Sequence, residues 1–93
     1  LPAHVGRAIW LDCDLLVLAD LGRLWESEIS RQLVLAARDP IVPTVSSRFG
    51  VAGHRELGLP PDAAYFNAGV MLVDLDGWRR ESVGRRASAY LQR

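Results

Sequence analysis

The sequence has few of the features that cross-link a small domain or anchor it in a membrane. It contains one cysteine, Cys13, so no disulfide can form within the chain, and we expect this side chain to point into the core as a small hydrophobe. No stretch approaches the ~18 consecutive apolar residues that a membrane-spanning helix needs. The N-terminal residues also lack a signal-peptide pattern. We therefore expect a cytoplasmic protein, with peripheral association at the inner face of the membrane as a further option.

The sequence also lacks an excess of charge of either sign. Eleven basic residues, all of them arginine, balance eleven acidic residues, and the formal net charge is zero. A nucleic-acid-binding module relies on a strong positive field, so this balance argues against a nucleic-acid partner. Several arginines gather between residues 79 and 93, where we expect a solvated helix face. A surface for anionic lipids is the alternative.

What the sequence does contain is a globular composition, with 49% hydrophobic residues among 93. A chain of this length makes one domain at most and buries only somewhat over ~60% of its unfolded surface. It begins close to a strand-like run and ends inside a helical pattern. We therefore expect residues 1–93 to be a single partial domain.

Short apolar runs and helical spacings predict an α/β fold. The runs are nearly continuous in hydrophobicity, which is typical of strands covered on both faces in a mostly parallel sheet. The expected strands are residues 8–11, 15–19, 33–37 and 69–73. The expected helices are residues 21–26, with Asp20 as N-cap, 75–80 and 82–93. The long stretch between residues 39 and 65, rich in proline, glycine and serine, is of a length that is usually functional.

The most distinctive short motif is Asp12-Cys13-Asp14, which lies between the apolar residues 8–11 and 15–18. Ionised carboxylates are costly in apolar surroundings unless something positive offsets them. Mg²⁺ and Mn²⁺ prefer oxygen ligands and often share their coordination between one or two carboxylates and a substrate's phosphates. Residues i and i+2 of an extended strand point the same way, so both carboxylates can face one ion. A surface turn is the alternative, because Asp-x-Asp is a common pattern.

A second distinctive segment, residues 65–75, reads Tyr-Phe-Asn-Ala-Gly-Val-Met-Leu-Val-Asp-Leu. It has the form of a turn that enters a buried strand. The Asn67 amide can both donate and accept hydrogen bonds, and Gly69 lets another group approach the backbone closely. Taken alone, the segment is more typical of an Asx-type turn at the start of a strand than of a binding site.

Together the two motifs resemble family 8 of the retaining glycosyltransferases, which includes bacterial lipopolysaccharide galactosyl- and glucosyltransferases and the glycogenins. The resemblance is carried by residues 8–17, 20–21, 24–25, 36–37, 39, 65–75 and 78, nearly the whole chain apart from the long loop. It implies a GT-A fold, an α/β sandwich around a mixed, mostly parallel sheet. It also implies metal-dependent transfer of a hexose from a UDP-sugar to a sugar or glycan acceptor, with retention of configuration, as in lipopolysaccharide biosynthesis.

The resemblance also assigns roles to individual residues. Asp12 and Asp14 match the pair that holds Mn²⁺ or Mg²⁺ on the diphosphate of the nucleotide sugar, and Asp12 matches the aspartate that also reaches the ribose. Asp39 matches a contact to donor-sugar hydroxyls, with a helix N-cap or a strand-end turn as the alternative. Asn67 matches a residue beside the donor sugar, and the Ala68-Gly69 backbone matches the lining of the acceptor side.

The sequence departs from the family pattern in several places. The family has an earlier nucleotide-binding strand and helix, a later Asp-Gln segment near the anomeric carbon, and a histidine and a Lys-Pro pair that complete the metal and phosphate site. Residues 1–93 match none of these, and His4 and His54 stand in other contexts. We therefore expect the central part of a catalytic domain, which needs further N- and C-terminal parts and is inactive alone.

Two alternatives stay open. Phosphotransferases of the haloacid dehalogenase type also place Asp-x-Asp after an apolar strand, with the first aspartate, here Asp12, as nucleophile. That class usually has Thr or Val two residues after the second aspartate, where this sequence has Leu16. The other alternative is a non-catalytic, nucleotide-sugar-binding remnant of a glycosyltransferase.

Overall fold

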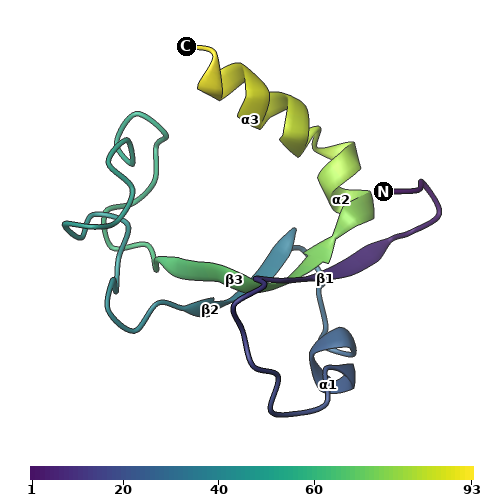
Figure 1. Cartoon of the computed structure of the whole chain (residues 1–93). Coiled ribbons are helices and arrows are strands. Elements are labelled where there is room, and N and C mark those ends of the chain that lie inside the picture. Colours follow the sequence, from purple (N-terminus) through teal and green to yellow (C-terminus); the bar gives the residue numbers. More distant parts are fainter. The chain divides into compact units, whose positions relative to one another are not determined.

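The computed structural model describes all residues from 1 to 93, which form three strands and three short helices. The strands are β1 (Arg7–Leu11), β2 (Val34–Arg38) and β3 (Phe66–Asp74), and the helices are α1 (Gly22–Trp25), α2 (Leu75–Arg80) and α3 (Val83–Leu91). The strands make one sheet in the order β1-β3-β2, so the longest strand, β3, is the central one (Figure 1).

The sheet is antiparallel. β1 pairs with β3 in a register that places Arg7 opposite Asp74 and Leu11 opposite Val70. β2 lies along the other edge of β3 and is also antiparallel to it. The N–H of Asp74, at the end of β3, donates to the carbonyl of Leu33, just before β2, and the N–H of Asp39, just after β2, donates to the carbonyl of Tyr65, just before β3. The expected mostly parallel sheet is therefore not what these residues form. A continuous apolar run indicates that both faces of a strand are covered, but it carries no information about strand direction.

Most of the expected elements are present with shifted ends. The strands expected at residues 8–11, 33–37 and 69–73 correspond to β1, β2 and β3, and the helices expected at 75–80 and 82–93 correspond to α2 and α3. The helix expected at 21–26 is shortened to α1, and Leu21 rather than Asp20 occupies its N-cap position. Asp20 still contributes just before the helix, because its Oδ1 accepts a hydrogen bond from the Gly22 N–H at 2.8 Å.

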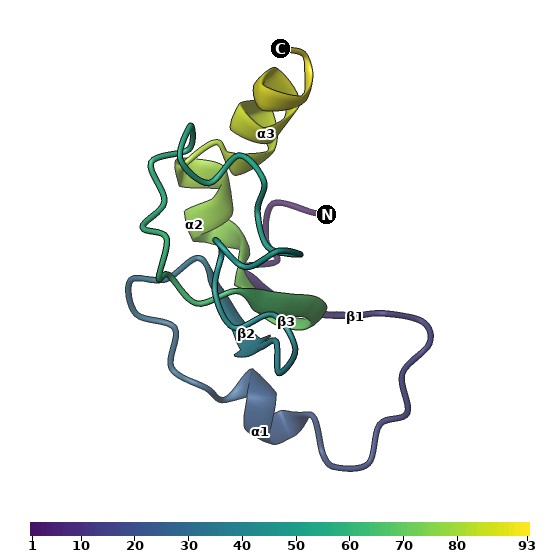
Figure 2. The same cartoon turned by 90° about the vertical axis from the view of Figure 1, so that its left-hand side faces the viewer.

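The strand expected at residues 15–19 is absent. These residues lie in an irregular, exposed loop that joins β1 to α1 (Figure 2). The side chains of Leu16 and Leu18 are 82% and 86% exposed. A short apolar run without periodicity does not by itself determine secondary structure, and no other strand of the sheet pairs with this segment.

The chain divides into two compact units, each of which has its own internal packing. The sheet–helix unit is Leu1–Leu35 with Val70–Arg93, and the loop unit is Ala36–Gly69. In the sheet–helix unit α1 lies on one side of β1 and α2 on the other, as Figures 1 and 2 show. α2 contacts both β1 and α3, and Leu72 of β3 is fully buried. None of the helices is long and apolar enough to cross a lipid bilayer.

Two side chains join the sheet to α2 and to the N-terminal segment. The Asp74 carboxylate caps α2 by accepting a hydrogen bond from the Gly77 N–H at 3.0 Å. The Arg79 guanidinium donates to the carbonyls of Val5 and Pro2, each at 2.9 Å. The residues before β1 are therefore held against the helix that follows β3.

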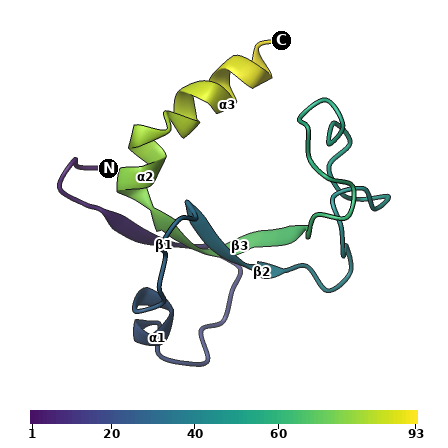
Figure 3. The same cartoon turned by 180° about the vertical axis from the view of Figure 1, so that it is seen from behind.

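The loop unit is mostly irregular. A single β-bridge pairs Thr44 with Ala64 in this unit. The side chain of Val45 is buried, at 6% exposure. The hydroxyl groups of Thr44 and Ser47 lie 3.0 Å apart. Figure 3 shows the chain of this unit looping between the ends of β2 and β3.

The packing around Gly77 gives a test of the joint between β3 and α2. A Cβ atom at Gly77 would lie 2.5 Å from Asp74 Oδ2 and 2.8 Å from Leu33 Cδ2. We expect Gly77→Ala to lower the free energy of unfolding by about 1–3 kcal/mol, because the cap or Leu33 must shift. Gly84→Ala in α3, where a Cβ would meet nothing within 4 Å, is the matched control and should raise it by up to about 1 kcal/mol. Urea unfolding measures both changes, and equal stabilities would contradict the close packing at Gly77.

Candidate functional site

Asp12 and Asp14 lie just beyond the end of β1 in the sheet–helix unit. The strand ends at Leu11, Asp12 follows it, and Cys13 and Asp14 form a turn. Both aspartates are exposed, so they do not occupy the apolar strand end that the sequence predicted, and strand alternation does not fix them on one side. Cys13 is exposed as well, and the expectation that it packs in the core is wrong. All three residues are exposed because the strand ends at Leu11, before the motif begins.

One neighbouring side chain holds the Asp12 carboxylate. Trp10 Nε1 donates a hydrogen bond to Asp12 Oδ1 at 3.2 Å. Both salt bridges of the structure belong to α2 and its cap, so no protein cation neutralises Asp12 or Asp14. The two carboxylates are therefore open to a cation from solution.

The donor set suits a hard divalent cation but is incomplete by itself. Carboxylate oxygens are ligands that Mg²⁺ and Mn²⁺ prefer, and these ions often take further ligands from phosphates and water. No group of three or more His, Cys, Asp or Glu side chains in the chain is placed to hold a metal. Asp12 and Asp14 would therefore supply the protein ligands from these residues, and a diphosphate and water would supply others.

Asp39 lies in the loop unit, directly after β2. Its Oδ1 accepts hydrogen bonds from the N–H groups of Ile41 at 2.8 Å and Val42 at 2.9 Å. Its own N–H donates to the carbonyl of Tyr65, just before β3. The strand-end turn, one of the two structural alternatives to a sugar contact that the sequence left open, is present in the structure. It occupies Oδ1 and leaves Oδ2 for another partner.

Asn67 lies in β3, also in the loop unit. Its Oδ1 accepts a hydrogen bond from the Gly69 N–H at 2.8 Å, which is the local Asx-type bond that the motif predicts. Gly69 is buried, whereas Asn67 and Ala68 are exposed. The bond uses the acceptor of the side-chain amide and leaves its two N–H donors for a ligand. The structural role and a binding role are therefore compatible in one side chain.

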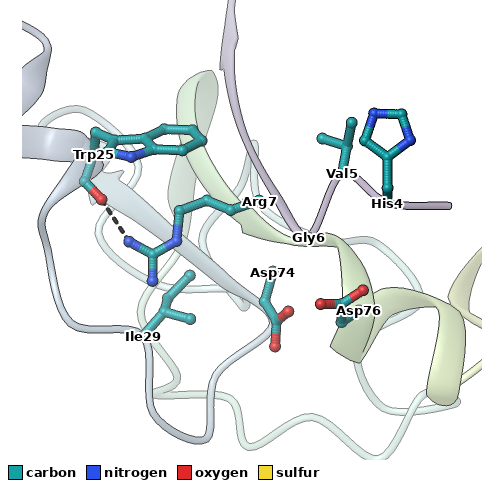
Figure 4. Close-up of a pocket in the computed structure, with 8 residues that line it drawn as sticks. All are labelled: His4, Val5, Gly6, Arg7, Trp25, Ile29, Asp74 and Asp76. Carbon is teal, nitrogen blue, oxygen red and sulfur yellow. Dashed lines mark hydrogen bonds between the residues drawn. The ribbon is translucent and has the colours of Figure 1, made fainter. Parts of the chain in front are cut away.

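A pocket at the other end of β1 was not predicted from the sequence. Residues that line it include His4, Gly6, Arg7, Trp25, Asp74 and Asp76 (Figure 4). The Arg7 guanidinium lies 5.8 Å from the centroid of the Trp25 ring and donates to the Trp25 carbonyl. Asp74 caps α2, and Asp76 forms an ion pair with Arg79 at 3.1 Å. These charged groups hold the fold together, and no sequence motif marks Arg7 because its partner is a backbone carbonyl far along the chain.

Comparison with known families bears directly on the Asp-x-Asp and Asn-Ala-Gly motifs. The family model for glycosyl transferase family 8 matches residues 1–93, the whole chain. The chain belongs to glycosyltransferase family 8. Family membership confirms the resemblance seen in the sequence and favours a glycosyltransferase over the phosphotransferase alternative.

Curated relatives in bacteria and plants match most of this family 8 chain but are much longer. It is similar to general stress protein A of Bacillus subtilis, with 29% identity over 91 residues that cover 94% of this chain and 28% of that protein. It is also similar to probable galacturonosyltransferase-like 3 of Arabidopsis thaliana, with 31% identity over 96 residues that cover 99% of this chain and 28% of that protein. The chain thus spans less than a third of the length of these relatives. No solved structure matches the chain at a significant level.

Two substitutions at Asn67 test its bond with Gly69, because one keeps the side-chain acceptor and the other removes it. Asn67→Asp keeps an oxygen that accepts from the Gly69 N–H, so we expect the free energy of unfolding to change by less than about 0.5 kcal/mol. Asn67→Ala removes the acceptor and should lower this free energy by about 1 kcal/mol. Urea unfolding distinguishes the two, and equal destabilisation by both variants would show that Asn67 does not act through this bond.

Proposed function

We propose that this protein is a metal-dependent, retaining glycosyltransferase that moves a hexose from a UDP-sugar to a sugar or glycan acceptor. The observation that carries the proposal is the family 8 match over residues 1–93. Two open carboxylates, Asp12 and Asp14, support it because they are the ligand type that a cation on a diphosphate needs. The family implies a GT-A fold, and the α/β sheet–helix unit is compatible with a part of one.

In the proposed mechanism Asp12 and Asp14 would hold Mn²⁺ or Mg²⁺ on the diphosphate of the donor. When bound, the cation acts as a Lewis acid for the charge that develops on the departing nucleoside diphosphate. Asp39 accepts a hydrogen bond from a sugar hydroxyl through Oδ2, because Oδ1 is already occupied by the strand-end turn. The Asn67 amide donates to the donor sugar, and the Ala68-Gly69 backbone lines the acceptor side.

The proposed activity needs further parts of the protein besides these residues. The chain covers 28% of each of the two relatives described above, so we propose that residues 1–93 are the central part of a catalytic domain and inactive alone. We propose a saccharide acceptor of the lipopolysaccharide type, on the resemblance to the bacterial enzymes. Because one relative is named for galacturonosyl transfer, the donors to be compared include UDP-galacturonate as well as UDP-glucose and UDP-galactose.

The proposal predicts metal-dependent UDP release by the full-length protein. We expect one UDP-sugar of the panel to give UDP release with Mn²⁺ and little release with EDTA. Asp14→Asn should reduce the Mn²⁺-dependent rate by about 100-fold or more, because it removes a charged ligand of the cation that stabilises the leaving group. A coupled assay for free UDP measures each rate.

Asp20→Asn is the matched control for this experiment. Asp20 is an exposed aspartate of the same loop, and an asparagine keeps the oxygen that accepts from the Gly22 N–H. Its rate should stay within about twofold of wild type. No UDP release from any donor by a folded, Mn²⁺-loaded protein would instead favour the non-catalytic, nucleotide-sugar-binding alternative.

A further inference from the structure

Trp10 is a large apolar side chain that lies mostly exposed on the sheet. It is the fourth residue of β1, and its side chain is 56% exposed although tryptophan is among the largest apolar side chains. Its indole N–H donates to Asp12 Oδ1 at 3.2 Å. An indole has one donor and no acceptor, so this single bond uses the whole polar capacity of the side chain.

The position of Trp10 in the sheet gives the bond its effect. Trp10 lies opposite Met71 of β3, so the pairing of the two strands fixes its backbone. Asp12 lies two residues later, after the strand has ended and in front of the exposed turn at Cys13-Asp14. The hydrogen bond therefore links the Asp12 carboxylate, which lies outside the sheet, to a residue whose backbone is held within the sheet.

The bond restricts one carboxylate oxygen and leaves the other open. An exposed aspartate side chain samples several rotamers, and fixing it on a cation costs conformational entropy. A donor that holds Oδ1 in place before the cation arrives reduces this cost. Partners that orient a metal ligand through a hydrogen bond typically change metal affinity by about 10–100-fold when they are removed. An exposed bond of 3.2 Å should lie at or below the lower end of that range.

We infer that Trp10 is a positioning residue of the divalent-cation site, which orients Asp12 through its indole N–H. The inference rests on the proposed function, because it takes Asp12 as a ligand of the cation. It predicts that Trp10 affects the binding of the cation and not the chemistry of the loaded enzyme. The loss of Trp10 should therefore be overcome by saturating Mn²⁺.

The experiment uses the full-length protein and compares three substitutions at tryptophan. Trp10→Phe keeps an aromatic ring but removes the donor. Trp10→His keeps a five-membered ring whose Nε2–H occupies the place of the indole N–H. Trp25→Phe is the matched control, because Trp25 is 46% exposed and its ring lies beside Arg7 instead of an aspartate. Isothermal titration calorimetry at pH 8 measures the binding of UDP as a function of Mn²⁺, and UDP release measures the Mn²⁺ concentration that gives half-maximal rate.

We expect Trp10→Phe to raise the apparent Kd for Mn²⁺ by about 3- to 10-fold, with kcat at saturating Mn²⁺ within about twofold of wild type. Trp10→His should recover most of this loss, and Trp25→Phe should bind Mn²⁺ as the wild type does. A merely structural role of Trp10 would lower kcat at every Mn²⁺ concentration, and that result would overturn the inference.

Two further outcomes separate this inference from the proposed function. If Asp14→Asn weakens Mn²⁺-dependent UDP binding while Trp10→Phe and Trp25→Phe both match wild type, the metal site stands and the role of Trp10 is overturned. Equal losses in Trp10→Phe and Trp10→His overturn it as well, because the variant that keeps a donor gains nothing. If the wild type binds UDP equally with Mn²⁺ and with EDTA, the proposed metal site fails and the inference fails with it.

Discussion

At Asp74 the central strand of the sheet ends, and three other segments are held to it there. The carboxylate satisfies the Gly77 N–H, one of the backbone donors that the first turn of α2 would otherwise leave unpaired. The backbone N–H of the same residue donates to the carbonyl of Leu33, just before β2, and its register partner is Arg7 of β1. A single position therefore ties both edge strands and the second helix to β3.

This arrangement separates structural polar groups from open ones along β1. At the start of the strand, Nη1 of the Arg7 guanidinium donates to the carbonyls of Trp25 and Ser27. At its end, Asp12 receives one hydrogen bond from a side chain and no ion pair. A charged group that bonds to distant backbone helps to hold a fold together, whereas a carboxylate with an unused oxygen can take a ligand. The strand β1 thus begins at a charged side chain bonded to distant backbone and is followed by a carboxylate that keeps an unused oxygen.

The sequence predicted the local features well and the non-local ones poorly. Helix α2 has the bounds that helical spacing predicts, because its cap and apolar positions lie close together in the chain. Strand direction and the loop at residues 15–19 depend on partners distant in sequence, which an apolar run does not specify. The Asp12-Cys13-Asp14 motif was found from its residues, but its exposure was not, because the strand stops at Leu11 and does not continue through Asp14. The bond from Trp10 depends on rotamers, and no pattern encodes it.

The exposed leucines beyond the aspartates also affect how these residues behave in solution. Leu16 and Leu18 are 82% and 86% exposed, and Leu91 near the end of α3 is 82% exposed. Soluble monomers rarely present large contiguous apolar surfaces, and such surfaces promote aggregation when nothing covers them. The consecutive apolar residues 15–18 line one surface, whereas Leu91 is not among the residues that line it. Covering residues 15–18, by another part of the protein or by a second molecule, would remove this apolar surface from water and so favour association.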